Sequence, residues 1–146
     1  MPQKVNPIPY DNQNIFPYIM VDGVSRLIDF LQAVFNAELT YKLDRNDGTV
    51  MHAEVKIGNN RIMMGEPTEQ IGAMPVSLYI YVADCDKVYQ AALDAGGTSI
   101  MEVTTMQHAG ERYGGIKDFA GNIWWIASHV EDITIEESQK RIKEML

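Results

Sequence analysis

Along the first half of the chain, the spacing of hydrophobic positions switches between the period of a helix and the period of a strand. Apolar residues recur at helical spacing over residues 24–35, which predicts an amphipathic helix. Apolar and polar residues alternate along Val50–Ile57, which predicts a strand with Met51 on one face and His52 and Glu54 on the other. The expected elements of this half are strands at 16–21, 39–43, 50–57 and 61–66 and a helix at 24–36.

The second half has its clearest pattern at 110–129, where a glycine-rich run leads through a turn into an aromatic run. Tyr113–Lys117 and Ile123–Ala127 are rich in β-forming residues, and a Gly-Asn pair lies between them. Both residues of that pair tolerate positive φ, so we predict a β-hairpin. Gly114 and Gly115 lie inside its first strand. Glycine weakens a strand, so we expect a bulky group there, either a ligand or a neighbouring side chain, close to the backbone.

The two halves show the same pattern when the sequence is shifted by 61 residues without a gap. Phe16 then falls on Ser77, and Met64 falls on Trp125. Hydrophobic positions and turns agree along the shifted halves, although identities are few. Such an internal repeat predicts two modules of the same structure in tandem.

The region 110–129 resembles the signature that closes domains of the vicinal oxygen chelate superfamily, which includes glyoxalase I, bleomycin-resistance proteins and extradiol dioxygenases. It is most similar to the PhnB-like branch. This chain departs from the signature at residues 118–122, where it has Asp-Phe-Ala-Gly-Asn in place of Asp-Pro-Phe-Gly-His. The matching residues are Gly110, Glu111, Arg112, Tyr113, Gly114, Asp118, Gly121, Trp124, Ile126, Ala127 and His129.

The resemblance covers residues 15–129 and, with the repeat, implies an α+β fold. Two tandem βαβββ modules are expected to form a curved mixed sheet around a cleft, followed by a C-terminal helix. Thr134 and Glu137 fit a capping box at the start of that helix, whose apolar stripe is narrow. The helix either packs on the sheet edge or a partner subunit, or stays solvated. The expected parts of this one domain are a lead at 1–14, a first module at 15–66, a linker at 67–75, a second module at 76–129 and the helix within 130–146.

In that superfamily, a divalent metal is held by residues on the first and last strands of each module, usually His and Glu. The repeat places these positions at Phe16, Met64, Ser77 and Trp125. These side chains lack the imidazole or carboxylate that a divalent cation needs, so we expect no metal and no other cofactor. A register error of two residues would add Glu66 as one ligand, and three would still be missing.

Strand alternation predicts which side chains line the cleft. Aromatic walls with a few polar groups are typical of a small-molecule site, and this lining has that character. His52 and Glu54 form a candidate acid/base pair on one strand face, and a structural or orienting role is the alternative. The predicted ligand-binding residues are Phe16, Tyr18, His52, Glu54, Ser77, Tyr79, Tyr81, Tyr113 and Trp125.

Charge and composition narrow the expected partners. The net charge is −8 and the lysines and arginines form no cluster, which argues against nucleic acid and anionic membranes as partners. A single cysteine, Cys85, excludes an intramolecular disulfide, and no signal-peptide pattern is present, so a cytoplasmic protein is expected.

Two classes of function follow. The first is a metal-free binding protein, similar to bleomycin-resistance proteins, for a small aromatic or cationic molecule. The alternative is an enzyme: a metal-dependent lyase, isomerase or dioxygenase of the glyoxalase type, or a metal-independent enzyme that uses His52 and Glu54. Members of the superfamily commonly dimerise, so a homodimer is expected in either case.

Overall fold

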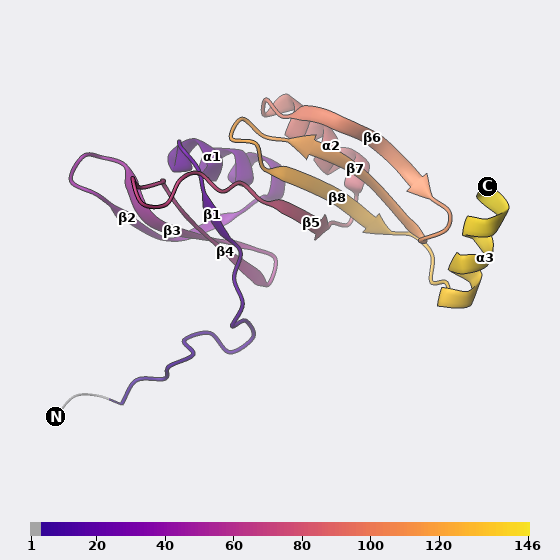
Figure 1. The fold of residues 1–146 in the computed structure, drawn as a ribbon, viewed down its shortest axis with the longest axis horizontal. Coiled ribbons are helices and arrows are strands. Elements are labelled where there is room, and N and C mark those ends of the chain that lie inside the picture. Colours follow the sequence, from indigo (N-terminus) through magenta and orange to yellow (C-terminus); the bar gives the residue numbers. More distant parts are fainter. Residues whose placement is uncertain (1–3) are drawn as a thin grey trace.

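Two four-stranded sheets with the same strand order make up the fold in the computed structural model, which describes residues 4–146. The helices are α1 (Val24–Phe35), α2 (Cys85–Asp94) and α3 (Ile135–Met145) (Figure 1). The strands are β1 (Tyr18–Met20), β2 (Glu38–Asp44), β3 (Val50–Ile57), β4 (Asn60–Gly65), β5 (Ser77–Tyr81), β6 (Thr98–Met106), β7 (Glu111–Lys117) and β8 (Ile123–His129).

Each sheet is mixed, because its first strand pairs in parallel with its last. The first sheet has the order β1-β4-β3-β2 and the second has the order β5-β8-β7-β6. Only β1 with β4 and β5 with β8 are parallel pairs, and the other pairs are antiparallel. The prediction of an α+β fold with two tandem βαβββ modules and a C-terminal helix is confirmed.

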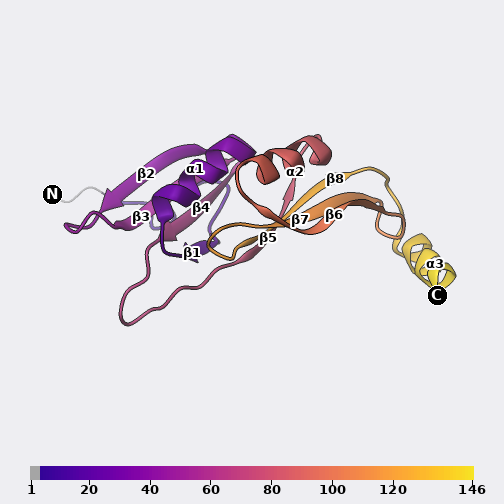
Figure 2. The same cartoon turned by 90° about the horizontal axis from the view of Figure 1, so that it is seen from above.

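Helices α1 and α2 cover the same side of the two sheets (Figure 2). The apolar stripe of α1, which includes Leu27 and Leu31, is fully buried against the first sheet. The modules meet beneath the helices, where the ring of Phe35 lies 5.6 Å from that of Trp124. The opposite face of both sheets has no helix on it, and the candidate site residues have to be sought there.

The repeat contains one extra residue in its second half. Tyr18 pairs with Met63 in the first sheet, whereas Tyr79 pairs with Trp125 in the second. Met63 is therefore the equivalent of Trp125, and the gap-free alignment is wrong by one residue in the last strand. Met64 pairs with Ile19 and is fully buried in the core. The extra residue belongs to the β7–β8 turn, which is longer than the β3–β4 turn.

The alternation predicted for β3 fails at its start. A bulge opposite Leu43 and Asp44 gives β3 one residue more than its partner strand. As a result Val50 is buried, with 1% exposed, and Met51 is 47% exposed instead of facing the core. From Ala53 onwards the strand has regular pairing with β4.

The predicted hairpin at 110–129 is confirmed, but its Asn has another role. Gly121 has a φ of 92°, as expected for the turn, whereas Asn122 is fully buried. The Asp118 carboxylate accepts hydrogen bonds from the Asn122 side-chain amide at 2.9 Å and from the indole of Trp124 at 2.8 Å. Asn122 in turn accepts from the backbone of Val76 at 3.0 Å. Two signature residues, Asp118 and Trp124, together with Asn122, which departs from the signature, therefore lock the turn to the start of the second module.

Helix α3 lies beyond the end of the second sheet (Figure 1) and is held mainly by polar contacts. The Thr134 hydroxyl accepts a hydrogen bond from the Glu137 backbone at 3.1 Å, which confirms the predicted N-cap. Arg141 contacts Glu131 and the Gln107 carbonyl, each at 2.7 Å. None of the residues of α3 is buried. Among residues 4–146, no helix combines the length and apolar character needed to cross a membrane.

Candidate functional site

The predicted ligand-binding residues form two separate groups on the helix-free face. The first-sheet cluster contains Phe16, Tyr18, His52 and Glu54, together with Tyr10 and Tyr41. The second-sheet cluster contains Ser77, Tyr79, Tyr81, Tyr113 and Trp125, together with Glu111. Among residues 4–146, no aromatic contact on this face joins the two clusters.

His52 and Glu54 do form a pair in the first-sheet cluster. Nε2 of His52 lies 3.0 Å from Oε2 of Glu54, and the Tyr10 hydroxyl donates to Oε1 at 2.7 Å. These two partners cover the carboxylate, so Glu54 is only 7% exposed. The hydrogen bond to Glu54 raises the pKa of Tyr10, which therefore stays a protonated donor at neutral pH. Both carboxylate oxygens are thus satisfied from within the chain, which fits the orienting role better than a free general base.

Two members of the first-sheet cluster escaped the sequence analysis. Tyr41 packs its ring at 5.8 Å from that of His52, and alternation along β2 could have placed it on this face. Tyr10 lies in the N-terminal lead, where no periodic pattern marks a buried or facing position. Its hydrogen bond to Glu54 assigns Tyr10 to this cluster, and that bond joins residues far apart in the sequence. The ring of Phe16 lies 5.3 Å from the ring of Tyr10, just ahead of β1.

The second-sheet cluster is a continuous array of aromatic rings. Tyr79 lies 5.3 Å from Tyr81 and 5.6 Å from Tyr113, and Tyr113 lies 6.0 Å from Trp125, measured between ring centroids. The Tyr81 hydroxyl donates a hydrogen bond to Glu111. Partial burial, followed by the charge of Glu111, raises the pKa of Tyr79 to about 12, so its hydroxyl is neutral at physiological pH.

The glycine pair in β7 makes room for neighbouring side chains. A Cβ on Gly115 would lie 2.7 Å from the Trp125 ring, and one on Gly114 would lie 2.9 Å from the Tyr89 ring. Of the two alternatives for the bulky group, the structure shows the neighbouring side chain. Trp125 therefore packs closely against β7 at Gly115 and forms one end of the ring array.

Both clusters are open to solvent in a single chain. Tyr18 is 41% exposed, Tyr79 is 43% exposed and Tyr81 is 61% exposed. The side chains expected to line one cleft thus lie on an open face in two sets. Exposed rings in such numbers are typical of a binding surface rather than of a solvated one.

The positions at which the resemblance expects metal ligands have other contacts. Ser77 accepts a hydrogen bond from the Trp125 indole at 2.9 Å, Phe16 packs on Tyr10, and Met64 is in the core. Glu66 accepts hydrogen bonds from the backbone of Gly23 and of Val50. Within residues 4–146, no three His, Cys, Asp or Glu side chains are grouped so that they could hold a metal ion. The residues present therefore do not fit a divalent cation at these positions.

Comparison with known proteins identifies relatives of this chain. The uncharacterized protein Mb0911c of Mycobacterium bovis is 28% identical over 134 residues, which are 84% of this chain and 88% of that protein. The PhnB protein from Bacillus cereus superposes with a TM-score of 0.64 and 18% identity, over 80% of this chain and 99% of that one. The fosfomycin resistance protein FosX from Listeria monocytogenes, solved with Mn(II) and sulfate, superposes with a TM-score of 0.62 and 20% identity, over 91% of this chain and 99% of that one.

The sequence itself matches a described protein family over residues 15–126, a region that spans both βαβββ modules. That region includes the repeat, the hairpin and most of the closing signature. This chain belongs to the glyoxalase/bleomycin resistance protein/dioxygenase superfamily.

Proposed function

We propose that this protein binds a small organic molecule, aromatic or cationic, on its helix-free face and that binding requires no metal. The observation that carries the proposal is the open ring array of the second-sheet cluster, with the carboxylate of Glu111 at its edge. Tyr and Trp side chains provide large apolar contact areas with few rotatable bonds, which suits a ligand platform. Membership of the superfamily, which includes bleomycin-resistance proteins, supports a binding role.

The charge of the site favours a cation. Tyrosine and tryptophan rings attract a cation to their negative faces, and Glu111 adds a carboxylate to the second-sheet cluster. The net charge of −8 attracts cationic molecules over a longer range. An aromatic cation gains from both the stacking and the electrostatic contribution.

A homodimer would enclose the ligand. In the arrangement we propose, the first sheet of one copy faces the second sheet of its partner, so that the two clusters come together around each ligand. Covering the exposed tyrosines would also stabilise the dimer through burial of apolar surface. Light scattering should give twice the chain mass of 16.5 kDa, and a monomer at micromolar concentration would contradict this arrangement.

Titration with an aromatic cation tests the ligand site. Ethidium, added to the purified protein, should bind saturably, and Trp125→Ala should weaken its affinity at least tenfold. Tyr89→Phe is the matched control, because Tyr89 contacts β7 at Gly114 on the opposite face of the strand from Trp125 and lies outside the ring array. Equal affinity of the wild type and Trp125→Ala would remove Trp125 from the site. The aromatic anion 8-anilinonaphthalene-1-sulfonate tests the charge preference: tighter binding of this anion than of ethidium would contradict the preference for a cation.

The glyoxalase-type enzyme is the second candidate, and FosX favours it because that structure has the same fold with bound Mn(II). Metal analysis of protein purified without a histidine tag, with thermal melts in Mn²⁺, Ni²⁺, Zn²⁺ and Fe²⁺, separates the two. A metal that binds only the folded chain must raise the melting temperature. Stoichiometric metal with such a rise would replace the metal-free proposal with the enzyme.

A further inference from the structure

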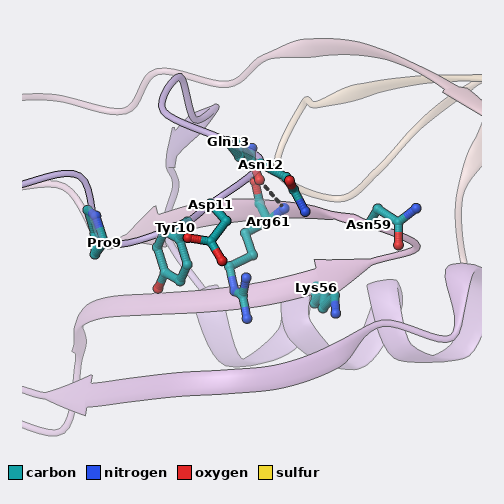
Figure 3. Close-up of a pocket in the computed structure, with 8 residues that line it drawn as sticks. All are labelled: Pro9, Tyr10, Asp11, Asn12, Gln13, Lys56, Asn59 and Arg61. Carbon is teal, nitrogen blue, oxygen red and sulfur yellow. Dashed lines mark hydrogen bonds between the residues drawn. The ribbon is translucent and has the colours of Figure 1, made fainter. Parts of the chain in front are cut away.

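The N-terminal segment crosses the β3–β4 hairpin and encloses a polar pocket beside the first-sheet cluster (Figure 3). We call residues 9–13 the strap. The pocket has a volume of about 260 Å³. Its lining consists of Pro9, Tyr10, Asp11, Asn12, Gln13, Lys56, Asn59 and Arg61.

Two cations line this pocket, one from each strand of the hairpin. Lys56 and Arg61 are directly paired in the β3–β4 register, so both side chains emerge on the same face. Like charges directly opposite each other destabilise a pair of strands. Neither residue takes part in an ion pair among residues 4–146, although the chain as a whole carries a large excess of negative charge.

The guanidinium of Arg61 is oriented but not neutralised. Its Cζ lies 4.3 Å from the centre of the Tyr10 ring, and its Nε is buried without a hydrogen-bond partner. The nearest buried carboxylate, Glu54, uses its two oxygens for Tyr10 and His52. Asp11 is the one acid that lines the pocket, and it is exposed and forms no ion pair in the described part of the chain.

Amide groups complete the wall. The side chain of Gln13 is fixed by two hydrogen bonds to the backbone of Arg61, at 2.9 and 2.7 Å. Asn12 and Asn59 add side-chain amides towards the turn of the β3–β4 hairpin (Figure 3). The Gln13 amide nitrogen donates to the carbonyls of Arg61 and Ile15, so the amide N–H groups available to a ligand are those of Asn12 and Asn59. A planar guanidinium, an ammonium and amide N–H groups are the donors that bind the oxygens of phosphates and carboxylates.

We propose that the strap pocket binds a small oxyanion, the phosphate or carboxylate group of a metabolite, between Arg61 and Lys56. The anion pairs with both cations, which have no carboxylate partner among residues 4–146. This site lies on the first sheet and uses none of the residues of the second-sheet ring array, so its test is independent of the proposed function.

Inorganic phosphate and malonate are the probes. The side-chain amide resonances of Asn12, Gln13 and Asn59 in a ¹H–¹⁵N spectrum should shift saturably with one of them, at constant ionic strength maintained with sodium chloride. Saturation by phosphate or by malonate identifies which oxyanion the pocket prefers. Shifts that stay linear, or that sodium chloride alone reproduces, would overturn the proposal.

Variants connect the shifts to the pocket. Arg61→Gln should weaken the oxyanion affinity at least tenfold, and Lys56→Gln should weaken it severalfold while leaving the Arg61–Gln13 backbone contacts intact. Lys87→Gln, which removes an exposed charge from α2, is the matched control and should bind like the wild type. Wild-type affinity in both pocket variants would exclude the site. The dispersion of each spectrum shows whether the variant is folded, and Trp125→Ala should leave the oxyanion affinity unchanged.

Discussion

The indole N–H of Trp125 donates a hydrogen bond of 2.9 Å to the hydroxyl oxygen of Ser77. The two residues belong to neighbouring parallel strands and stand where the resemblance expected metal ligands in the second module. A hydrogen bond between two side chains thus occupies the positions at which two metal ligands were expected. This hydrogen bond fixes the plane of the Trp125 ring. A ring held in this way loses little conformational freedom when a ligand stacks on it.

Gly115→Ala should displace that ring. The new Cβ would lie 2.7 Å from the Trp125 ring and 2.8 Å from the side chain of Ile100, so one of them must move. Overpacking of this kind costs about 1–3 kcal/mol of unfolding free energy. Urea unfolding should show the loss, and near-UV circular dichroism should show the changed environment of Trp125.

Gly72→Ala is the control for this substitution, because no atom lies within 4 Å of the added Cβ there. It should unfold like the wild type. A Gly115→Ala protein with unchanged stability and an unchanged near-UV spectrum would show that the ring is not packed on β7.

Asp118→Ala should be far more disruptive. The carboxylate is 6% exposed and accepts from the side-chain amide of Asn122 and from the Trp124 indole, both of them fully buried. Buried donors left without an acceptor cost about 1–3 kcal/mol each. With two such donors, we expect a loss of about 2–6 kcal/mol of unfolding free energy in chemical denaturation. Asp94→Asn, at an exposed helical position, should change the stability little. A similarly small loss for Asp118→Ala would show that the hydrogen bonds from Asn122 and Trp124 to this carboxylate do not hold the turn.

Local patterns explain why the fold could be predicted. The helical spacing of 24–35, the alternation of Val50–Ile57 and the turn before Ile123 are properties of neighbouring residues, and each produced the expected element. The one-residue slip in the repeat has a local cause as well. Ile62, Met63 and Met64 are all apolar, so the sequence does not mark which of them face the core, and a gap-free comparison hides the longer β7–β8 turn.

The candidate site depended on contacts that no local pattern records. Tyr10 reaches Glu54 from a lead without periodicity, across 44 positions of the chain. The division of the predicted residues into two clusters follows from how the modules pack through Phe35 and Trp124 beneath the helices. Alternation could assign side chains to a face, but it could not assign them to one site.

His129 should make stability depend on pH. Its pKa is raised above the ordinary 6.5, first by the hydrogen bond to Asp132 and then by that to Glu111, because both carboxylates stabilise the imidazolium. A raised pKa in the folded state adds stability that is complete below pH 6.5 and is lost as the pH rises through the folded-state pKa.

The melting temperature of the wild type minus that of His129→Gln should therefore be largest at pH 5.5–6 and should shrink towards pH 8–9. NMR titration of the His129 ring gives its pKa directly, and Asp132→Asn should lower that value. A difference in melting temperature that does not vary with pH would contradict the assignment of the imidazolium to this cluster.

The side chain of Gln13 makes the backbone hydrogen bond that Pro17 cannot donate. The Met63 N–H donates to the Pro17 carbonyl at 2.9 Å, and a parallel ladder would have the next bond run from the residue 17 N–H to the Arg61 carbonyl. Proline has no N–H, so the Gln13 side-chain amide donates to that carbonyl instead, at 2.9 Å, and accepts from the Arg61 N–H at 2.7 Å. The Gln13 side chain thus anchors the strap to the backbone of β4, in addition to the hydrogen bond from Tyr10 to Glu54.

Gln13→Ala should release both backbone groups of Arg61 and loosen the strap with them. We expect the Arg61 amide to exchange with solvent at least ten times faster and the unfolding free energy to fall by about 1–3 kcal/mol, since two hydrogen bonds of about 0.5–1.5 kcal/mol are lost. Gln70→Ala, in the exposed linker, is the matched control and should leave both quantities unchanged. Unchanged, slow exchange of the Arg61 amide in Gln13→Ala would show that Gln13 does not hold the strap on the sheet. Tyr10→Phe, which removes the hydrogen bond from Tyr10 to Glu54, would then be the next variant to test.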